Sequence, residues 1–197
     1  MNPAFKMIEL VQYAKEIGAT DAALIPAKNI CVEERLADYC RPPGCHQFGK
    51  AMSCPPHVAG PSAFRQWLPQ FEQGLVFKID MAPQAISDDQ GLLLFRRLHE
   101  IASAVQKRAV LMGFHHSKGF AGGSCKVILC ADEEVCSVVA HGAPCRHPLT
   151  AKPSLSGFGV NVSKLIESAG WEMKRFSLLP DASPETPVTL CGLVLIG

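Results

Sequence analysis

The stretch GLVFKIDMAPQAISDDQGLLLFRRLHEIASAVQKRAVLMG, residues 74–113, decides the fold because it predicts a strand followed by a long helix. Residues 75–81 are mostly apolar and lie between a glycine and a proline, which predicts the strand. Ser87 with Gln90 matches a capping box at the start of the helix. The apolar stripe of the helix repeats at helical spacing: Leu94, Leu98, Ile101, Val105, Ala109 and Met112. The helix therefore has one apolar face that can pack on a sheet.

The chain before this stretch predicts one amphipathic helix and several short elements. Pro3 suits a first helical position, and apolar residues recur at helical spacing until Gly18. Residues 22–25 and 29–32 predict short strands, and residues 62–71 predict a short helix. A helix and a strand region thus precede the central pair.

The chain after this stretch predicts a helix and a closing hairpin. In the long region that follows, only residues 126–129 resemble a strand. Asn161 can cap a helix over residues 162–169. Residues 171–178 and 188–196 predict two strands joined by a proline-rich turn. These two strands would complete the sheet.

Together these elements predict an α+β fold (mixed α/β), in which a mixed β-sheet carries packed helices. The 197 residues, 48% of them hydrophobic, suit a single metal-binding domain over residues 1–197. Residues 33–61 and 114–160 lack apolar periodicity and contain most of the cysteines. Loops of such length are uncommon unless they are functional or cross-linked. We expect them to form two cysteine-rich metal-binding loops at one end of the sheet.

Charge and hydropathy exclude several classes of partner. The net charge is +1, so the chain lacks the basic excess of proteins that bind nucleic acid or a membrane surface. No apolar run approaches the roughly 18 to 20 residues of a membrane span, and the first ten residues lack the pattern of a signal peptide. We therefore expect a cytoplasmic protein with no nucleic-acid and no membrane partner.

The nine cysteines call for a chemical explanation. In the reducing cytoplasm, a chain rich in cysteine uses its thiols as metal ligands or redox groups more often than in disulfides. Seven of the cysteines fall into two short windows. The first set is Cys40, Cys45 and Cys54, and the second set is Cys125, Cys130, Cys136 and Cys145. Metal binding would order loops that have no apolar core of their own.

The second set has enough thiolates for one iron–sulfur cluster or for one tetrahedral zinc ion. Structural zinc sites usually use pairs of ligands two to four residues apart, whereas the gaps here are four, five and eight residues. Iron–sulfur ligation tolerates such gaps, and prolines and glycines are usual beside its cysteines. The spacing favours an iron–sulfur cluster, with zinc as the alternative.

The first set supplies only three cysteines. A fourth ligand would come from His57, from Cys31, from a distant group, or from outside the protein. A cluster held by three cysteines leaves one iron open to water or substrate, which would allow enzymatic chemistry. Cys31 and Cys191 lie in apolar segments, so we expect both to be small core residues.

Other polar residues near the cysteines are weaker candidates. Three histidines near the cysteines can take part directly or through a ligand: His46, His57 and His147. Three basic residues beside the cysteines would offset the negative charge of a thiolate-bound cluster: Arg41, Lys126 and Arg146. His115 and His116 are expected to be solvated. Phosphate-binding loops, nucleophile elbows and the cysteine triplet of radical enzymes are absent from the sequence.

At these residues the chain resembles the DUF2284 family of predicted metal-binding proteins. The resemblance begins at Val32-Glu-Glu-Arg35 and includes Cys54-Pro-Pro-His57. It resumes at Gly122-Gly-Ser-Cys-Lys126, and continues through Cys145-Arg-His-Pro148 and Lys152-Pro-Ser154 to Gly159-Val-Asn-Val162. It implies that the seven clustered cysteines bind metal, in iron–sulfur form, and leaves the activity open.

The sequence thus predicts a protein with one or two iron–sulfur clusters, of the 4Fe–4S type, that transfers electrons to a redox partner protein. One alternative is a structural zinc protein or interaction module without redox activity. The other is an enzyme that works at an open iron of the first cysteine set. Whether the chain is an enzyme stays open at this point.

Overall fold

The computed structural model describes residues 2–84, 89–172 and 188–197. Its sheet has four strands in the order β1-β2-β4-β3, and each strand pairing is antiparallel. The strands are β1 (Asp21–Pro26), β2 (Gln73–Met81), β3 (Lys118–Phe120) and β4 (Val188–Ile196). The α+β class is confirmed. The expected mixed sheet is not found among the described strands, because each of their three pairings is antiparallel.

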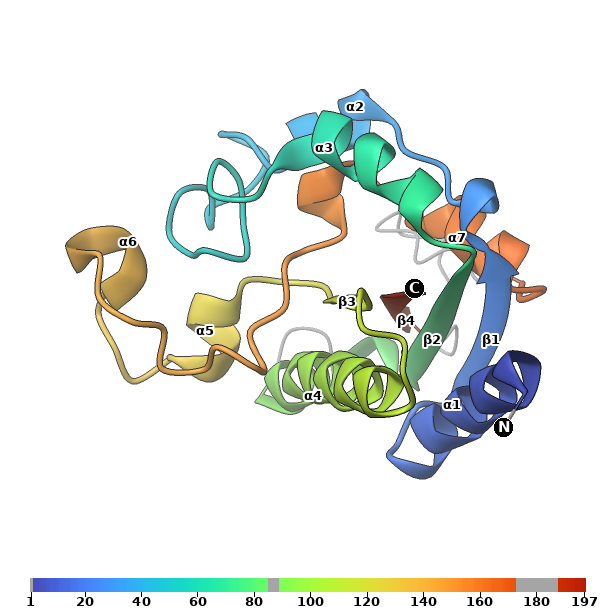
Figure 1. Ribbon diagram of the computed structural model, residues 1–197. Coiled ribbons are helices and arrows are strands. Elements are labelled where there is room, and N and C mark those ends of the chain that lie inside the picture. The colour runs from blue at the N-terminus through green and yellow to red at the C-terminus, as the bar shows by residue number, and fades with distance from the viewer. Residues whose placement is uncertain (1, 85–88, 173–187) are drawn as a thin grey trace.

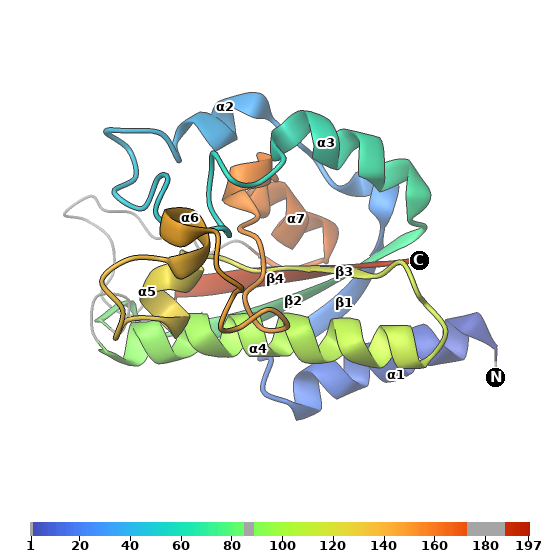
Figure 2. The same ribbon diagram turned by 60° about the vertical axis from the view of Figure 1, so that its left-hand side comes forward.

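Helices cover both faces of the sheet (Figures 1 and 2). One face carries α1 (Pro3–Glu16) and α4 (Asp89–Leu111). The other face carries α2 (Glu34–Asp38), α3 (Gly60–Trp67) and α7 (Val162–Ser168). The molecule is therefore layered as helices, sheet and helices, with a separate apolar core on each face of the sheet.

The core under α1 and α4 follows the predicted stripes. The Asn2 side chain accepts a hydrogen bond from the Ala4 amide at 3.0 Å and caps α1. Along α4, four residues of the predicted stripe are at most 1% exposed: Leu98, Ile101, Val105 and Ala109. Alternate residues of β2, such as Leu75 and Phe77, complete this core. The predicted capping box at Ser87 lies outside the described residues.

The opposite core centres on three aromatic rings that contact one another. The ring centroids of Phe64, Phe120 and Phe158 lie 5.1 to 5.4 Å apart. Alternate residues of β4, among them Leu193 and Leu195, face this cluster. This aromatic packing holds α3 and the turn at Ser156–Phe158 against β3.

Several short elements differ from the prediction. Residues 126–129 belong to a helix, α5 (Cys125–Leu129), and not to a strand. Residues 29–32 form no strand, and Val32 makes only an isolated bridge. The helix α2, the helix at Ser137–His141 and the strand β3 were not predicted. Of the predicted strand 171–178, all but its first two residues lie outside the described residues.

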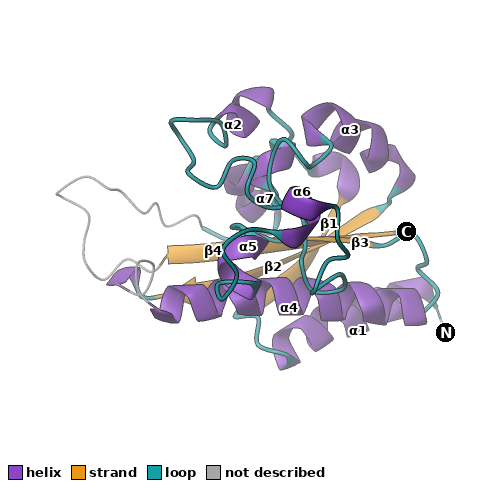
Figure 3. Cartoon of the chain, turned by 90° about the vertical axis from the view of Figure 1, so that its left-hand side faces the viewer, coloured by secondary structure: helices purple, strands orange, loops and turns teal. Residues whose placement is uncertain are grey.

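The two cysteine-rich segments lie side by side at one end of the molecule, as expected (Figures 1 and 3). There, α5 and α6 (Ser137–His141) approach the loop that precedes α3. α5 also contacts α4, which anchors this end to the sheet layer. In the described part of the chain, no helix has the length and apolar character needed to cross a membrane.

Candidate metal centre

The second cysteine segment is held in place by its first residues. The Ala121 amide donates to the Pro153 carbonyl at 3.0 Å, and the Leu155 amide donates to the Ala121 carbonyl at 2.9 Å. Gly123 has a φ of +76°, a left-handed conformation that favours glycine. A Cβ at this position would lie 2.9 Å from the Cδ1 atom of Ile128. The turn that places Ser124 and Cys125 therefore depends on glycine.

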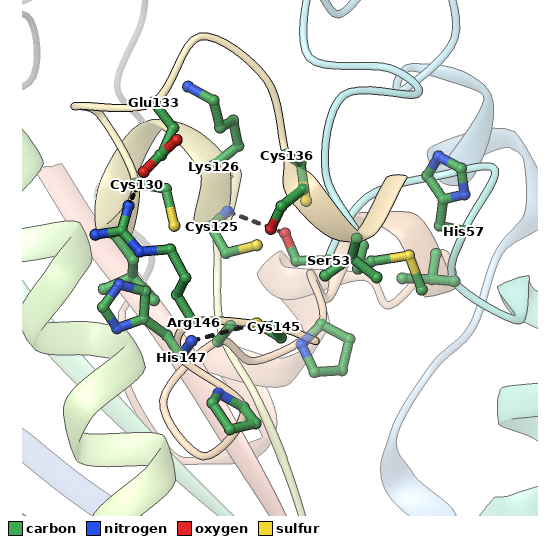
Figure 4. A pocket seen from close by; sticks show the side chains of 18 of the residues that line it. Ser53, His57, Cys125, Lys126, Cys130, Glu133, Cys136, Cys145, Arg146 and His147 are labelled. Carbon is green, nitrogen blue, oxygen red and sulfur yellow. Dashed lines mark hydrogen bonds and ion pairs between the residues drawn. The ribbon is translucent and has the colours of Figure 1, made fainter. Parts of the chain in front are cut away.

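The four cysteines of the second set line one cavity of about 480 Å³. Two short helices position three of them, since Cys125 begins α5, Cys130 ends it and Cys136 precedes α6. Cys145 comes from the loop after α6. Figure 4 shows the four side chains gathered around this cavity. Four thiols spread over 125–145 thus line one cavity.

Charged groups at the edge of this larger cavity are mostly paired. The Arg146 guanidinium forms ion pairs with Asp132, at 3.2 Å, and with Glu133. The pairing lowers the pKa of the Asp132 carboxyl through a hydrogen bond from Arg146. The His147 amide donates a hydrogen bond to the Cys145 sulfur at 3.4 Å. Such N–H···S contacts stabilise a negatively charged sulfur.

The three cysteines of the first set line a second, smaller cavity of about 180 Å³. The other residues of its wall come from both cysteine-rich segments: Gln47, Phe48, Pro55, Gly123, Ser124, Ser154 and Ser156. Each cysteine set therefore has a cavity of its own, and residues of the second segment complete the cavity of the first.

Burial keeps several of these thiols protonated. Desolvation raises the pKa of Cys40 to about 11. Burial also raises the pKa of Cys54, Cys125 and Cys130. Because a metal binds the thiolate, metal binding at these residues would release protons.

Ser53 joins the two cavities. Its hydroxyl accepts a hydrogen bond from the Cys125 amide at 3.0 Å and lies 3.7 Å from the Cys54 sulfur. Its carbonyl accepts from the Ser154 amide at 2.9 Å. Cys54 and Cys125 are 7% and 8% exposed and belong to one small apolar cluster. One cysteine of each set thus lies at the junction between the cavities.

Ser124 has an unusual environment for a serine. It is 6% exposed, and its hydroxyl makes no hydrogen bond to any described residue. The residue precedes α5 in the N-cap position, but its side chain does not cap the helix. Burial raises the pKa of the Cys54 thiol, and the Ser124 hydroxyl partly offsets this rise.

The other candidate ligands lie elsewhere. His57 lines the larger cavity and not the cavity of the first set, and its Nε2 atom lies 3.2 Å from the Gly49 carbonyl oxygen.

Cys31 lies outside the walls of both cavities and is only partly buried. Lys164 donates to the Cys31 sulfur at 3.6 Å. The prediction that Cys31 is a core residue is wrong, because its segment forms no strand. Cys191 is buried in β4, as predicted.

The remaining candidates are exposed. His46, His115 and His116 all lie on the surface, which confirms the expectation for the last two. Arg41 forms an ion pair with Asp38 at 3.4 Å, so part of its charge is already balanced.

The sequence analysis missed His99, which fastens two parts of the second cysteine-rich segment to α4. Its Nδ1 atom accepts from the Lys152 amide at 3.0 Å, and its Nε2 atom lies 3.1 Å from the Gly122 carbonyl oxygen. These partners require the neutral imidazole with the proton on Nε2. Burial lowers the pKa of His99 to about 4. A histidine next to the apolar stripe of the long helix was the available signal.

Lys152 and Gln106 extend this link. Burial lowers the pKa of Lys152 to about 8, and its Nζ atom donates to the Gln106 Oε1 atom at 2.7 Å. Gln106 in turn donates to the Ser117 carbonyl at 3.0 Å. The segment after Cys145 is therefore connected through α4 to the start of β3.

The donor set fits a sulfur-bound metal. Thiolates are soft ligands that select iron–sulfur clusters, zinc or copper(I). In their present positions, no three His, Cys, Asp or Glu side chains of the described residues form a group that could hold a single metal ion. What the described residues provide is two thiol-lined cavities and one buried hydroxyl without a partner.

Comparison with known proteins gives one family. No curated protein and no solved structure matches the chain significantly. The DUF2284 model, described as a predicted metal-binding protein, matches residues 23–196. This range covers nearly the whole chain and contains both cysteine sets. The chain therefore belongs to the DUF2284 family of predicted metal-binding proteins.

Proposed function

We propose that this protein binds iron–sulfur clusters and serves in electron transfer or redox chemistry in the cytoplasm. The second cysteine set would hold one 4Fe–4S cluster, and the first set would hold another. The observation that carries this proposal is the gathering of four thiols, from positions spread over 125–145, around one cavity. The three thiols around the adjoining cavity support it.

The size of the cavities supports a cluster over a single ion. A tetrahedral zinc ion lies only about 2.3 Å from each thiolate sulfur, so it needs almost no cavity. The cavities here measure about 480 and 180 Å³. Each is several times the roughly 30 Å³ that a water molecule occupies in the liquid. A group of several atoms is the better occupant.

The arrangement of the thiols supports electron transfer. Iron–sulfur clusters supply one-electron chemistry when bound. The protein's part is to hold the two sites close together, which Ser53 does by contacting Cys54 and Cys125. Five cysteines of the two sets are only partly buried: Cys40, Cys45, Cys130, Cys136 and Cys145. A redox partner protein can therefore approach either site from the surface.

Metal analysis of protein purified without oxygen tests this proposal. We expect iron and acid-labile sulfide in stoichiometric amounts, together with a broad absorption near ~400 nm. A colourless protein that contains zinc and no sulfide would overturn the proposal in favour of a structural zinc site. Zinc can also replace iron at an iron–sulfur site during aerobic purification. Anaerobic reconstitution with iron and sulfide distinguishes such zinc from native zinc.

A further inference from the structure

Three cysteines leave one iron of the proposed first cluster without a cysteine ligand. We infer that the hydroxyl oxygen of Ser124 is the fourth protein donor at the metal site of Cys40, Cys45 and Cys54. This inference rests on the function proposed above and assigns a ligand within the same site. It makes the first cluster a fully protein-bound centre and not an open catalytic iron.

The first argument is position. Ser124 lines the same cavity as the three cysteines of the first set. Its chain neighbour Cys125 belongs to the other cavity. Adjacent residues thus serve adjacent sites, and the glycine turn at Gly123 directs the chain between them.

The second argument is the missing partner of the hydroxyl. A serine in the N-cap position usually accepts a hydrogen bond from an amide of the first helical turn. Ser124 has an extended backbone, with φ −98° and ψ 118°, yet its side chain makes no such bond. Of the side-chain oxygen and nitrogen atoms in the described residues, its hydroxyl is the one that is buried without a hydrogen bond. A buried polar group without a partner requires an explanation, and a bound ion is one such explanation.

The third argument is that the other candidates are engaged or misplaced. His57 faces the larger cavity and contacts the Gly49 carbonyl. Cys31 lies outside both cavity walls, beside Lys164. Ser156 lines the cavity of the first set but is exposed to solvent. Ser154 also lines this cavity and is buried, but its hydroxyl is not among the described atoms that are buried without a hydrogen bond. Ser124 is therefore the buried hydroxyl without a partner in this wall.

Ligation by Ser124 is a simple exchange. The O–H bond breaks, the proton is released to solvent, and the oxygen lone pair forms a bond to iron. No electron is transferred in this step. An alkoxide is a harder donor than a thiolate and stabilises ferric iron, so it lowers the reduction potential of the site that it binds.

Four chains separate the outcomes: wild type, Ser124→Ala, Ser124→Cys and Ser156→Ala. Each is reconstituted anaerobically with iron and sulfide, and iron, sulfide, electron paramagnetic resonance spectrum and midpoint potential are measured. We expect S124A to lose one iron of the first cluster and to show the signal of a three-iron cluster after mild oxidation. S124C should keep all its iron and show a raised midpoint potential at one centre. S156A, which makes the same chemical change on an exposed side chain of the same cavity, should match the wild type.

Two results overturn different claims. If S124A keeps the iron content, spectrum and potential of the wild type, Ser124 is not a ligand, and the proposed function stands. If the wild type takes up no iron and sulfide, the proposed function itself fails. Should S124A fold poorly, S124C still decides, because an unchanged potential at both of its centres would contradict ligation by Ser124.

Discussion

The Cys125 amide donates a hydrogen bond to the Ser53 hydroxyl at 3.0 Å, across 72 positions of the sequence. This bond joins the two cysteine-rich segments at the place where their cavities adjoin. Both partners are buried, so water cannot replace the bond if it is lost.

Ser53→Ala should therefore destabilise the chain by about 1 to 3 kcal/mol, because it leaves the buried Cys125 amide without a partner. The measurement is urea denaturation of the metal-free, reduced protein. Ser156→Ala is the matched control, since its side chain is exposed and should change stability by less than about 0.5 kcal/mol. Equal midpoints for the two variants would show that the bond contributes nothing.

Cys54→Ala should remove the first metal site and leave the second. Cys54 lines the smaller cavity, whereas Cys31 lies outside both cavity walls. We expect about half of the iron and sulfide to be lost from C54A, since clusters of this type require their cysteine ligands. C31A should retain all of it. Identical iron contents for C54A and C31A would refute the assignment of the smaller cavity as a metal site.

The link made by His99 should weaken in acid. Burial lowers the pKa of His99 to about 4 in the folded chain, and Lys152 nearby also disfavours its charged form. An unfolded histidine has a pKa of about 6.5, so the unfolded chain binds this proton first as the pH falls. The contribution to stability is complete above about pH 6.5. It is lost as the pH falls toward about 4, and the total loss is about 3 kcal/mol.

Urea denaturation of wild type and His99→Gln between pH 4 and pH 8 measures this effect. The glutamine cannot titrate, so the difference in unfolding free energy between the two proteins should shrink as the pH falls. A difference that stays constant over this range would show that His99 is not responsible. The carboxylates are common to both proteins and cancel in the comparison.

Gly192 should be intolerant of a side chain. It pairs with Phe77 across the sheet, and a Cβ at position 192 would lie 2.2 Å from the Cζ atom of that ring. Because the ring is fully buried, Gly192→Ala should cost about 3 kcal/mol through overpacking. Gly142→Ala is the control. Position 142 has open space around it and only a left-handed φ of +61°, so we expect a cost of about 1 kcal/mol there. Thermal melting of both variants checks that Gly192→Ala loses more stability than Gly142→Ala.

The long elements could be predicted because their residues repeat with a clear period. The stripe from Leu98 to Ala109 and the proline at the first helical position, Pro3, are local signals, and both appear in the structure. The short elements carry too few residues for a period. Residues 127–129 are apolar and partly β-branched, which suits a strand in isolation, yet a helix begins there after the turn at Gly123. Tertiary context overrides local propensity in such short segments.

The grouping of the cysteines could be predicted, but not the contacts between the groups. Within each set, the cysteines are only a few residues apart in the sequence, which predicts that they lie close together in space. The contact of Ser53 with Cys125 depends on how β2 and α4 bring distant segments together, and no local pattern encodes it. His99 escaped notice for the same reason, because both of its partners are main-chain groups of remote loops.

The wall of the smaller cavity also bears on protein synthesis. Its three cysteines are all present once residue 54 has been added to the growing chain. Ser124, Ser154 and Ser156 are added much later. A nascent chain that ends before residue 156 therefore presents these thiols without the enclosure that the finished molecule provides. Any cofactor that needs that enclosure has to be inserted after residue 156 has been made.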